Sequence, residues 1–312
     1  SLFVGHHYSL APLPETPMAP RRADARIGLT TAAVLDYSDD VARSPRVRMV
    51  ERWRLEKKDP QADLSEPVKP ITFWIDRNVP LKYRAVVAEA LLEWNKAFER
   101  IGFKDAIVVK QQPDDAEFDT LDIGYSSVRW LMSAVPGFGA IGPKHVDPRS
   151  GEILDADVGF ETLSSRSLRS LRAQTLSGAA LDVYEARGEL EPESTQAEAF
   201  VHAYMKDTLM HEVGHVLGLR HNFRASRVYT EAQLADPEFT RLNGTTGSVM
   251  EYNAINLPRP GQRGGTPFQT TLGPYDYWAI EYAYKPIAPE QENAELLRIA
   301  ARSNDPLLAF GT

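Results

Sequence analysis

The residues with the most specific chemistry lie between positions 211 and 221, where the chain reads HEVGHVLGLRH in one-letter code. On an α-helix, residues four apart lie above one another on the same face, so His211 and His215 can direct two imidazoles at one cation. Glu212 projects beside them and can face a water molecule bound to that cation rather than the cation itself. These residue types at this spacing indicate a metal site with an adjacent general base.

A glycine ahead of the third histidine allows the chain to complete this site. Gly218 can adopt the left-handed conformation that ends a helix, after which the chain can turn back and bring His221 to the same cation. In a continuous helix, His221 would lie nearly three turns beyond His211 and out of reach. A purely structural role for the three histidines is the alternative, but the complete pattern arises very rarely by chance. We therefore expect His211, His215 and His221 to be metal ligands.

Together with a segment further along the chain, the motif resembles the signature of metzincins, a clan of zinc metallopeptidases. The chain reads SVMEY at positions 248–252, and Met250 follows His221 by 29 residues. The resemblance implies that Met250 is the methionine of the Met-turn, a hydrophobic floor beneath the zinc histidines. It also implies that Tyr252 is the tyrosine that astacin-like and serralysin-like members hold near zinc. There it can be a switchable fifth ligand and an oxyanion donor.

Other segments extend the resemblance over residues 70–290. Residues 276–284 resemble the C-terminal helix of matrixins and serralysins. Residues 139–143 and 153–158 resemble the rim and the edge strand of a metzincin cleft. An extended substrate would then pair with a substrate-edge strand that contains Asp155, Ala156, Asp157 and Val158. More narrowly, the chain resembles the bacterial family of Met-zincin domains. Residues 17–21 in its N-terminal part also resemble that family.

The resemblance implies an activity, a cofactor and a location. The chain would be a zinc endopeptidase with one catalytic Zn²⁺, Glu212 as general base and a peptide or protein as substrate. It would act outside the cytoplasm, in the periplasm or after secretion, although no targeting signal is recognisable in these residues. Asn222 departs from several subfamilies, which have Asp, Glu or Ser after the third histidine, so no named subfamily is assigned.

Other interpretations stay open. The chain could be a binding module that keeps zinc without turnover, although binding alone would not need Glu212 as a base. It could instead hydrolyse a non-peptide amide or ester. A calcium site is possible but unsupported, because the candidate carboxylates lack the spacing of a calcium-binding loop. These carboxylates are Asp114, Asp115, Asp119, Asp122, Asp155 and Asp157.

The composition is that of an ordinary globular protein. The chain has 312 residues, of which 43% are hydrophobic and 25% are charged, enough for one large domain or two of ordinary size. Lys and Arg number 35 against 43 Asp and Glu, a net charge of −8, so no nucleic-acid partner is expected. No apolar run is long enough to span a membrane. Cysteine is absent, which excludes disulfides, thiolate nucleophiles and Cys-ligated zinc.

The elements that must position the histidines can be predicted from hydrophobic periodicity and turn residues. Strands are expected at 71–75, 106–109 and 122–128, with two more within 137–160 joined by a turn at 147–151. Helices are expected from Pro80 to residue 101 and at 196–219, 275–284 and 290–302, with a Pro- and Gly-rich loop at 255–267. The fold class is α+β. The metzincin resemblance adds a twisted, mostly parallel sheet with an antiparallel edge strand, a long active-site helix and a smaller C-terminal subdomain with the Met-turn and a helix.

The domain organisation is predicted in three parts. Residues 1–66 are expected to form an extended arm, the end of a preceding region that packs on the catalytic domain. Residues 67–290 would be that catalytic domain, with an upper subdomain at 67–218 and a lower one at 219–290. Residues 291–312 would be a C-terminal helical extension, and residues 161–196 an insertion near the cleft.

Overall fold

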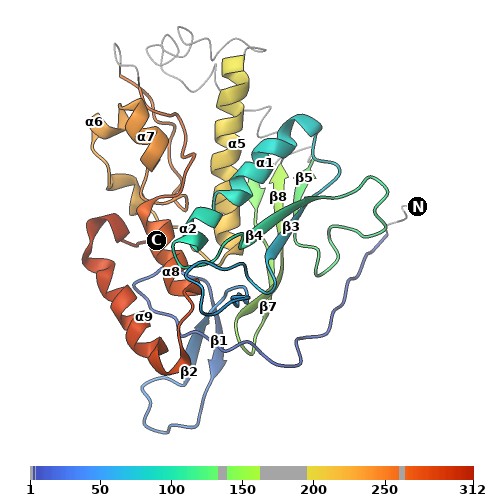
Figure 1. Ribbon diagram of the computed structural model, residues 1–312, viewed down its shortest axis with the longest axis vertical. Coiled ribbons are helices and arrows are strands. Elements are labelled where there is room, and N and C mark those ends of the chain that lie inside the picture. The colour runs from blue at the N-terminus through green and yellow to red at the C-terminus, as the bar shows by residue number, and fades with distance from the viewer. Residues whose placement is uncertain (1–2, 4, 133–138, 162–194, 260–263) are drawn as a thin grey trace.

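The computed structural model describes residues 3, 5–132, 139–161, 195–259 and 264–312 (Figure 1). The strands are β1 (Thr31–Leu35), β2 (Arg46–Val50), β3 (Ile71–Ile75), β4 (Ile107–Gln111), β5 (Ser127–Leu131), β6 (Ala140–Ile141), β7 (Lys144–Asp147) and β8 (Glu152–Glu161). The helices are α1 (Leu81–Leu92), α2 (Asn95–Glu99), α5 (Thr195–Val216), α6 (Glu231–Leu234), α7 (Pro237–Asn243), α8 (Pro274–Tyr284) and α9 (Glu292–Ala300). The predicted insertion at 161–196 lies almost wholly outside the described residues.

One mixed sheet organises the larger part of the fold. Its strand order is β4-β3-β5-β8-β6, and β7 also pairs with β8. The pairs β3–β4, β3–β5 and β5–β8 are parallel, whereas β6 and β7 run antiparallel to β8. This confirms the predicted mixed fold with a mostly parallel sheet, an antiparallel edge and one long helix.

Helices α1 and α5 pack against each other and against this sheet, α1 on β3 and β4 and α5 on β8. In β3, Ile71, Phe73 and Ile75 are buried while the residues between them are partly exposed, the alternation expected of a strand. Trp94, which is fully buried between α1 and α2, donates from its indole Nε1 to the carbonyl of Met210 at 3.1 Å. The α1–α2 region is therefore fastened to the turn of α5 that precedes the first histidine.

Two element predictions need local correction. The helix expected from Pro80 to residue 101 is divided into α1 and α2, because the amide of Ala97 bonds to the carbonyl of Trp94 in an i−3 pattern. Pro80 lies just before α1 rather than in its first turn. The strand expected at 122–128 begins only at Ser127, because the preceding residues form turns. In one of them Asp119 accepts from the amide of Leu121 at 2.8 Å.

The predicted substrate-edge strand is wrong, because β8 is an internal strand. Residues 157–161 pair with β5 on one side. On the other side, residues 152–156 pair with β7 and residues 159–160 with β6. The outermost strand on this side of the described sheet is β6, since the turn sequence at 147–151 folds the preceding chain back onto β8. The run of Asp155, Ala156, Asp157 and Val158 therefore offers no free main-chain edge to a substrate.

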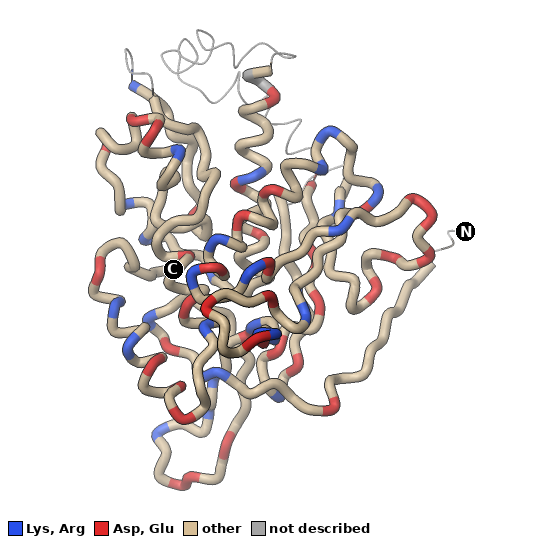
Figure 2. Tube along the Cα trace, in the orientation of Figure 1, with Lys and Arg blue, Asp and Glu red and all other residues tan. Residues whose placement is uncertain are grey.

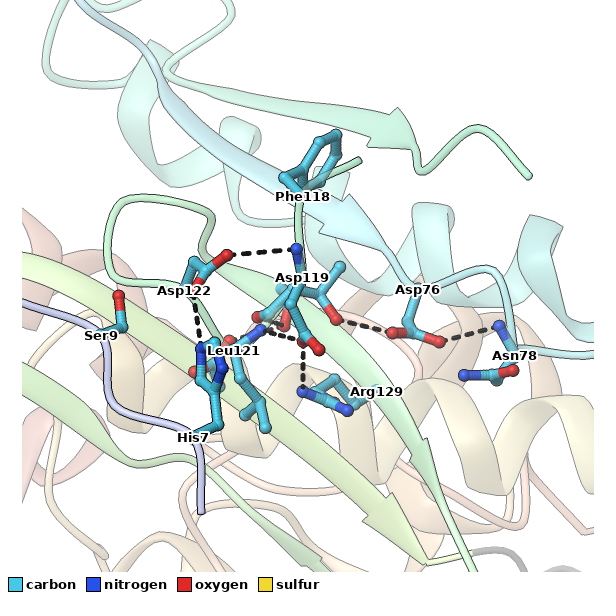
Figure 3. Close-up of polar contacts among 12 residues, drawn as sticks. His7, Ser9, Asp76, Asn78, Phe118, Asp119, Leu121, Asp122 and Arg129 are labelled. Carbon is cyan, nitrogen blue, oxygen red and sulfur yellow. Dashed lines mark hydrogen bonds and ion pairs between the residues drawn. The ribbon is translucent and has the colours of Figure 1, made fainter. Parts of the chain in front are cut away.

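The first 66 residues contain more regular structure than an extended arm. Strands β1 and β2 form an antiparallel pair at the bottom of Figure 1. Near the N-terminus, His7 Nε2 lies 2.8 Å from Asp122 Oδ1 (Figure 3). Ser9 Oγ accepts from the amide of Ile123 at 3.0 Å. Both contacts fasten this segment to the loop before β5.

Arg21 joins this N-terminal segment to the C-terminal end of α8. Its side chain is 4% exposed and donates to the carbonyls of Tyr282, Ala283 and Lys285, each at 3.0 Å. Its Nε also donates to Glu292 Oε1 at 2.9 Å. The last carbonyls of a helix have no partner within the helix, so a buried guanidinium supplies the donors that they need.

We expect Arg21→Ala to lower the free energy of unfolding by about 3 kcal/mol, because it leaves buried carbonyls without donors. Arg26→Ala is the matched control, since Arg26 is exposed and pairs with nearby Asp24. The control should cost about 0–1 kcal/mol. Urea denaturation of both variants measures the difference, and equal losses would contradict a capping role for Arg21.

Charged residues of both signs are spread over the described elements, as Figure 2 shows. None of the described helices combines the length and the apolar character that a membrane span requires.

Candidate metal centre

At the C-terminal end of α5 the chain reverses direction and runs back beside the last turns of this helix. The amide of Gly218 bonds to the carbonyl of His215 at 3.0 Å, and the amide of Leu219 bonds to that of Gly214 at 2.9 Å. This pair of bonds is a Schellman motif, and Gly218 has the positive φ of 99° that such an ending requires. A Cβ at this position would also lie 2.2 Å from the carbonyl oxygen of Glu51. The reversal brings His221 back beside the helix.

The three histidines form one group. Their ligand nitrogens all lie within 4.8 Å of one another, and Nε2 of His215 is 3.1 Å from Nε2 of His221. His211 Nδ1 donates to the carbonyl of Val249 at 2.7 Å, and His215 Nδ1 donates to that of Leu219 at 2.9 Å. Because carbonyls only accept, both rings carry the proton on Nδ1 and keep Nε2 as a lone-pair donor.

The histidine nitrogens fit a metal ion better than they fit the protein alone. His211 Nε2 is buried and has no hydrogen-bond partner among the described residues, which is costly unless a ligand satisfies it. Burial, with the neighbouring imidazoles, lowers the pKa of His211 to about 3, and burial lowers that of His215 to about 4. Both rings are therefore neutral near pH 7, as metal ligation requires. Three neutral imidazoles with a fourth side open are the donor set of a catalytic zinc site.

The segment 248–252 forms a turn beneath the histidines. Met250 is fully buried, and a Cβ added to Gly214 would lie 2.2 Å from its Sδ. The glycine between the two helical histidines thus allows the methionine to lie directly against the helix. This position agrees with the floor that the resemblance implied for Met250.

Asp276 holds this turn in its shape. Its Oδ1 accepts from Ser248 Oγ at 2.6 Å, and its Oδ2 accepts from the amides of Val249 at 2.9 Å and Gly273 at 2.8 Å. The carbonyl of Val249 in turn accepts from His211, so Asp276 orients the first histidine through the turn. In the sequence, Asp276 was noted only as the first residue of a segment that resembles the C-terminal helix of matrixins and serralysins. Nothing in the sequence indicated its role in holding the turn.

Glu212 and Tyr252 line the same cavity as His211. This cavity has a volume of about 380 Å³, and its described lining residues are Gly139, Ala140, Tyr204, Asp207, Thr208, His211, Glu212, Glu251, Tyr252, Asn253 and Phe268. Glu212 is buried and makes no hydrogen bond through its carboxylate in the described structure. Burial raises its pKa to about 7. A cation bound beside it would favour the ionised form instead.

Tyr252 lies over the histidine group but is not buried. Its ring centroid is 4.5 Å from that of His221 and 5.2 Å from that of His211, and the residue is 67% exposed. Burial, together with the charge of Glu212, raises the pKa of its phenol, which therefore stays protonated near neutral pH. No hydrogen bond holds its hydroxyl within the described structure. The phenol can rotate toward or away from the histidines.

The predicted strand residues do not join this site. Ser126 Oγ donates to Asp155 at 2.9 Å and Ser127 Oγ to Asp157 at 2.5 Å, so both carboxylates face β5 and its start. Neither they nor Ala156 and Val158 line the cavity. Among the described residues, the three histidines are also the only group of three or more His, Asp or Glu side chains close enough to share one ion. The calcium candidates therefore form no such group.

Asn222, which departs from several metzincin subfamilies, binds the C-terminal segment. It is fully buried, its Nδ2 donates to the carbonyl of Ala309 at 3.0 Å, and its Oδ1 accepts from the amide of Gly311 at 3.1 Å. Phe310 between these residues stacks on Tyr275 with ring centroids 6.1 Å apart. The chain beyond the third histidine is therefore held by its own C-terminal segment.

Comparisons with known proteins agree with this geometry. Residues 193–312 match the family model described as Met-zincin, which includes all three histidines and the turn at 248–252. Residues 2–58 match a second model, described as a domain of unknown function. No curated protein matches the chain. With its three-histidine group and buried methionine, the C-terminal part of this chain is similar to a metzincin domain.

Proposed function

We propose that the protein is a zinc-dependent endopeptidase. The observation that carries the proposal is a cavity lined by His211, the first of three clustered histidines, and by Glu212, whose carboxylate makes no hydrogen bond to a described residue. His211, His215 and His221 would hold Zn²⁺, which when bound supplies Lewis-acid polarisation of a scissile carbonyl and of water. An extracytoplasmic location, implied by the family resemblance, is part of the same proposal.

Glu212 moves the proton in this mechanism. Its carboxylate takes a proton from the attacking water and delivers it to the nitrogen of the leaving amine. The carboxylate lies close to Gly142, where an added Cβ would be 3.4 Å from Glu212 Oε2. The carboxylate thus lies against the β6–β7 connection, at the rim of the sheet. Its burial strengthens its interaction with the reacting groups.

The substrate is expected to lie along β6 rather than β8. Gly139 and Ala140 line the cavity beside Glu212, and β6 is the outermost strand at this end of the described sheet. An extended peptide could add to this edge through main-chain hydrogen bonds. Such docking would present successive peptide groups to Glu212 and the histidines.

Tyr252→Phe is expected to lower kcat by about 10–100-fold, because the phenol can donate to the oxyanion as charge develops. Zinc content should not change, and thermal stability should stay within about 1 kcal/mol, since the ring is largely exposed. Steady-state kinetics on a fluorogenic peptide measures the effect. An unchanged kcat would leave Tyr252 as a packing residue beside the histidines.

The proposed function is tested by metal analysis and peptide cleavage together. The purified chain should contain one Zn²⁺, and the zinc-loaded protein should cleave members of a fluorogenic peptide library. A chelator should abolish the cleavage, and added zinc should restore it. A protein that binds zinc and peptides but cleaves none would instead be the binding module considered from the sequence. Cleavage of non-peptide amides or esters alone would make it a hydrolase of another class.

A further inference from the structure

The cavity beside the histidines has an unbalanced charge. Its described lining includes three carboxylates, those of Asp207, Glu212 and Glu251, and no Lys or Arg. Glu212 is assigned to proton transfer, and Glu251 accepts from two backbone amides, those of Ser226 and Tyr252, at 3.1 Å each. Asp207 remains as the carboxylate without an assigned task.

Asp207 lines the cavity and is weakly bonded to the described residues around it. It lies four residues before His211 on α5, so both side chains share one face of the helix, one turn apart. Its single hydrogen bond comes from the amide of Gln269, at a long 3.4 Å. Asp276, by contrast, accepts three bonds of 2.6–2.9 Å. Lys206, the adjacent cation in sequence, points elsewhere and pairs with Glu93 at 3.2 Å.

Aromatic rings complete this end of the cavity. Tyr204 and Phe268 both line it, and their ring centroids are 5.6 Å apart in an edge-to-face arrangement. A pocket with aromatic walls and one carboxylate suits a long side chain that is apolar along its stem and cationic at its tip. A guanidinium fits best, since it can stack on a ring while it bonds to a carboxylate.

We propose that Asp207 makes this cavity a subsite for an arginine or lysine side chain next to the scissile bond. The inference rests on the proposed endopeptidase function and adds the class of substrate. Burial raises the pKa of Asp207 to about 7, and the long hydrogen bond from Gln269 offsets this only in part. A bound cation would compensate this carboxylate and stabilise its ionised form.

The test uses two labelled alanine hexapeptides that differ only at one central residue, arginine or its neutral isostere citrulline. Binding is measured by fluorescence anisotropy on the zinc-loaded Glu212→Ala protein, which should not consume the peptide, and cleavage is measured on the wild type. The arginine peptide should bind about 10-fold tighter or more, the usual size of a hydrogen-bonded charge pair. Adding Asp207→Asn should reduce this advantage to about 2-fold, whereas adding Glu89→Gln should leave it intact. Glu89 is an exposed carboxylate on α1, outside the cavity, and serves as the charge-matched control.

The outcomes separate this inference from the proposed function. Cleavage of both peptides with equal binding would overturn the cationic subsite and leave the endopeptidase standing. An arginine preference in binding without any cleavage would support the cationic subsite and overturn the endopeptidase function. A preference that survives Asp207→Asn would also overturn the role of Asp207. If Asp207→Asn does not fold, Asp207→Ser replaces it. Equal binding of the two peptides to the Glu212→Ala protein would overturn the proposal even without a variant of Asp207.

Discussion

Glu212→Ala is expected to lower peptide cleavage by about 10²–10⁴-fold, the usual contribution of a positioned general base. The histidines are unchanged in this variant, so zinc content should stay at one ion per chain. The fold should also persist, because no described residue depends on a hydrogen bond to this carboxylate. The loss should appear in kcat, since proton transfer belongs to the chemical step.

Two comparisons make the Glu212 result interpretable. Glu212→Gln keeps the volume of the side chain and removes only its basicity, so it should be as inactive as the alanine variant. Glu89→Ala removes an exposed carboxylate from α1 and should have the activity of the wild type. Activity of Glu212→Ala within a few-fold of the wild type would mean that another base, or a contaminating protease, performs the cleavage.

His221→Ala is expected to weaken zinc binding by about 100-fold or more. Zinc sites in small domains contribute about 10–16 kcal/mol, and a quarter of this for one of four ligands is about 2.5–4 kcal/mol, which corresponds to roughly 100-fold or more in affinity. His221 is the best choice among the three histidines because it lies in the chain after α5 and is only partly buried. Its removal should therefore leave the helix intact. Activity should fall with occupancy and recover in part at high zinc concentration.

His202→Ala is the matched control for this metal prediction. His202 lies on the same helix but packs edge-on against Tyr83, with ring centroids 6.1 Å apart and away from the histidine group. Zinc affinity measured by competition with a chromogenic chelator should fall for His221→Ala and not for His202→Ala. Equal affinities would show that His221 is not a ligand.

The metal centre was largely predictable from sequence because its geometry is local. His211 and His215 are four residues apart on a helix, and Gly218 specifies where that helix must end. The same holds for Met250, whose place follows from a short motif that resembles a known turn. The roles of Glu212 and Tyr252 stay predictions, since their chemistry depends on a substrate.

The parts that could not be predicted depend on contacts between distant residues. Whether β8 is an edge or an internal strand depends on where β6 and β7 fold back, and an alternating pattern looks the same in either case. Arg21 contacts a helix more than 250 residues away, without any periodicity around it. Asp207 could have been noticed from its spacing of four to His211, but only the structure shows that it lines the cavity with one long hydrogen bond from a described residue.

The contact of Arg21 with α8 bears on how this protein can evolve. The segments 2–58 and 193–312 match separate family models, yet each supplies part of the other's interior. Tyr275 accepts from the amide of Gly28 at 2.8 Å, and the amide of Thr30 bonds to the carbonyl of Gly218 at 2.8 Å. A recombination event that kept only the later segment would expose the end of α8 and the turn that leads to His221. We therefore expect genes to carry the two segments together, as one heritable unit rather than as interchangeable modules.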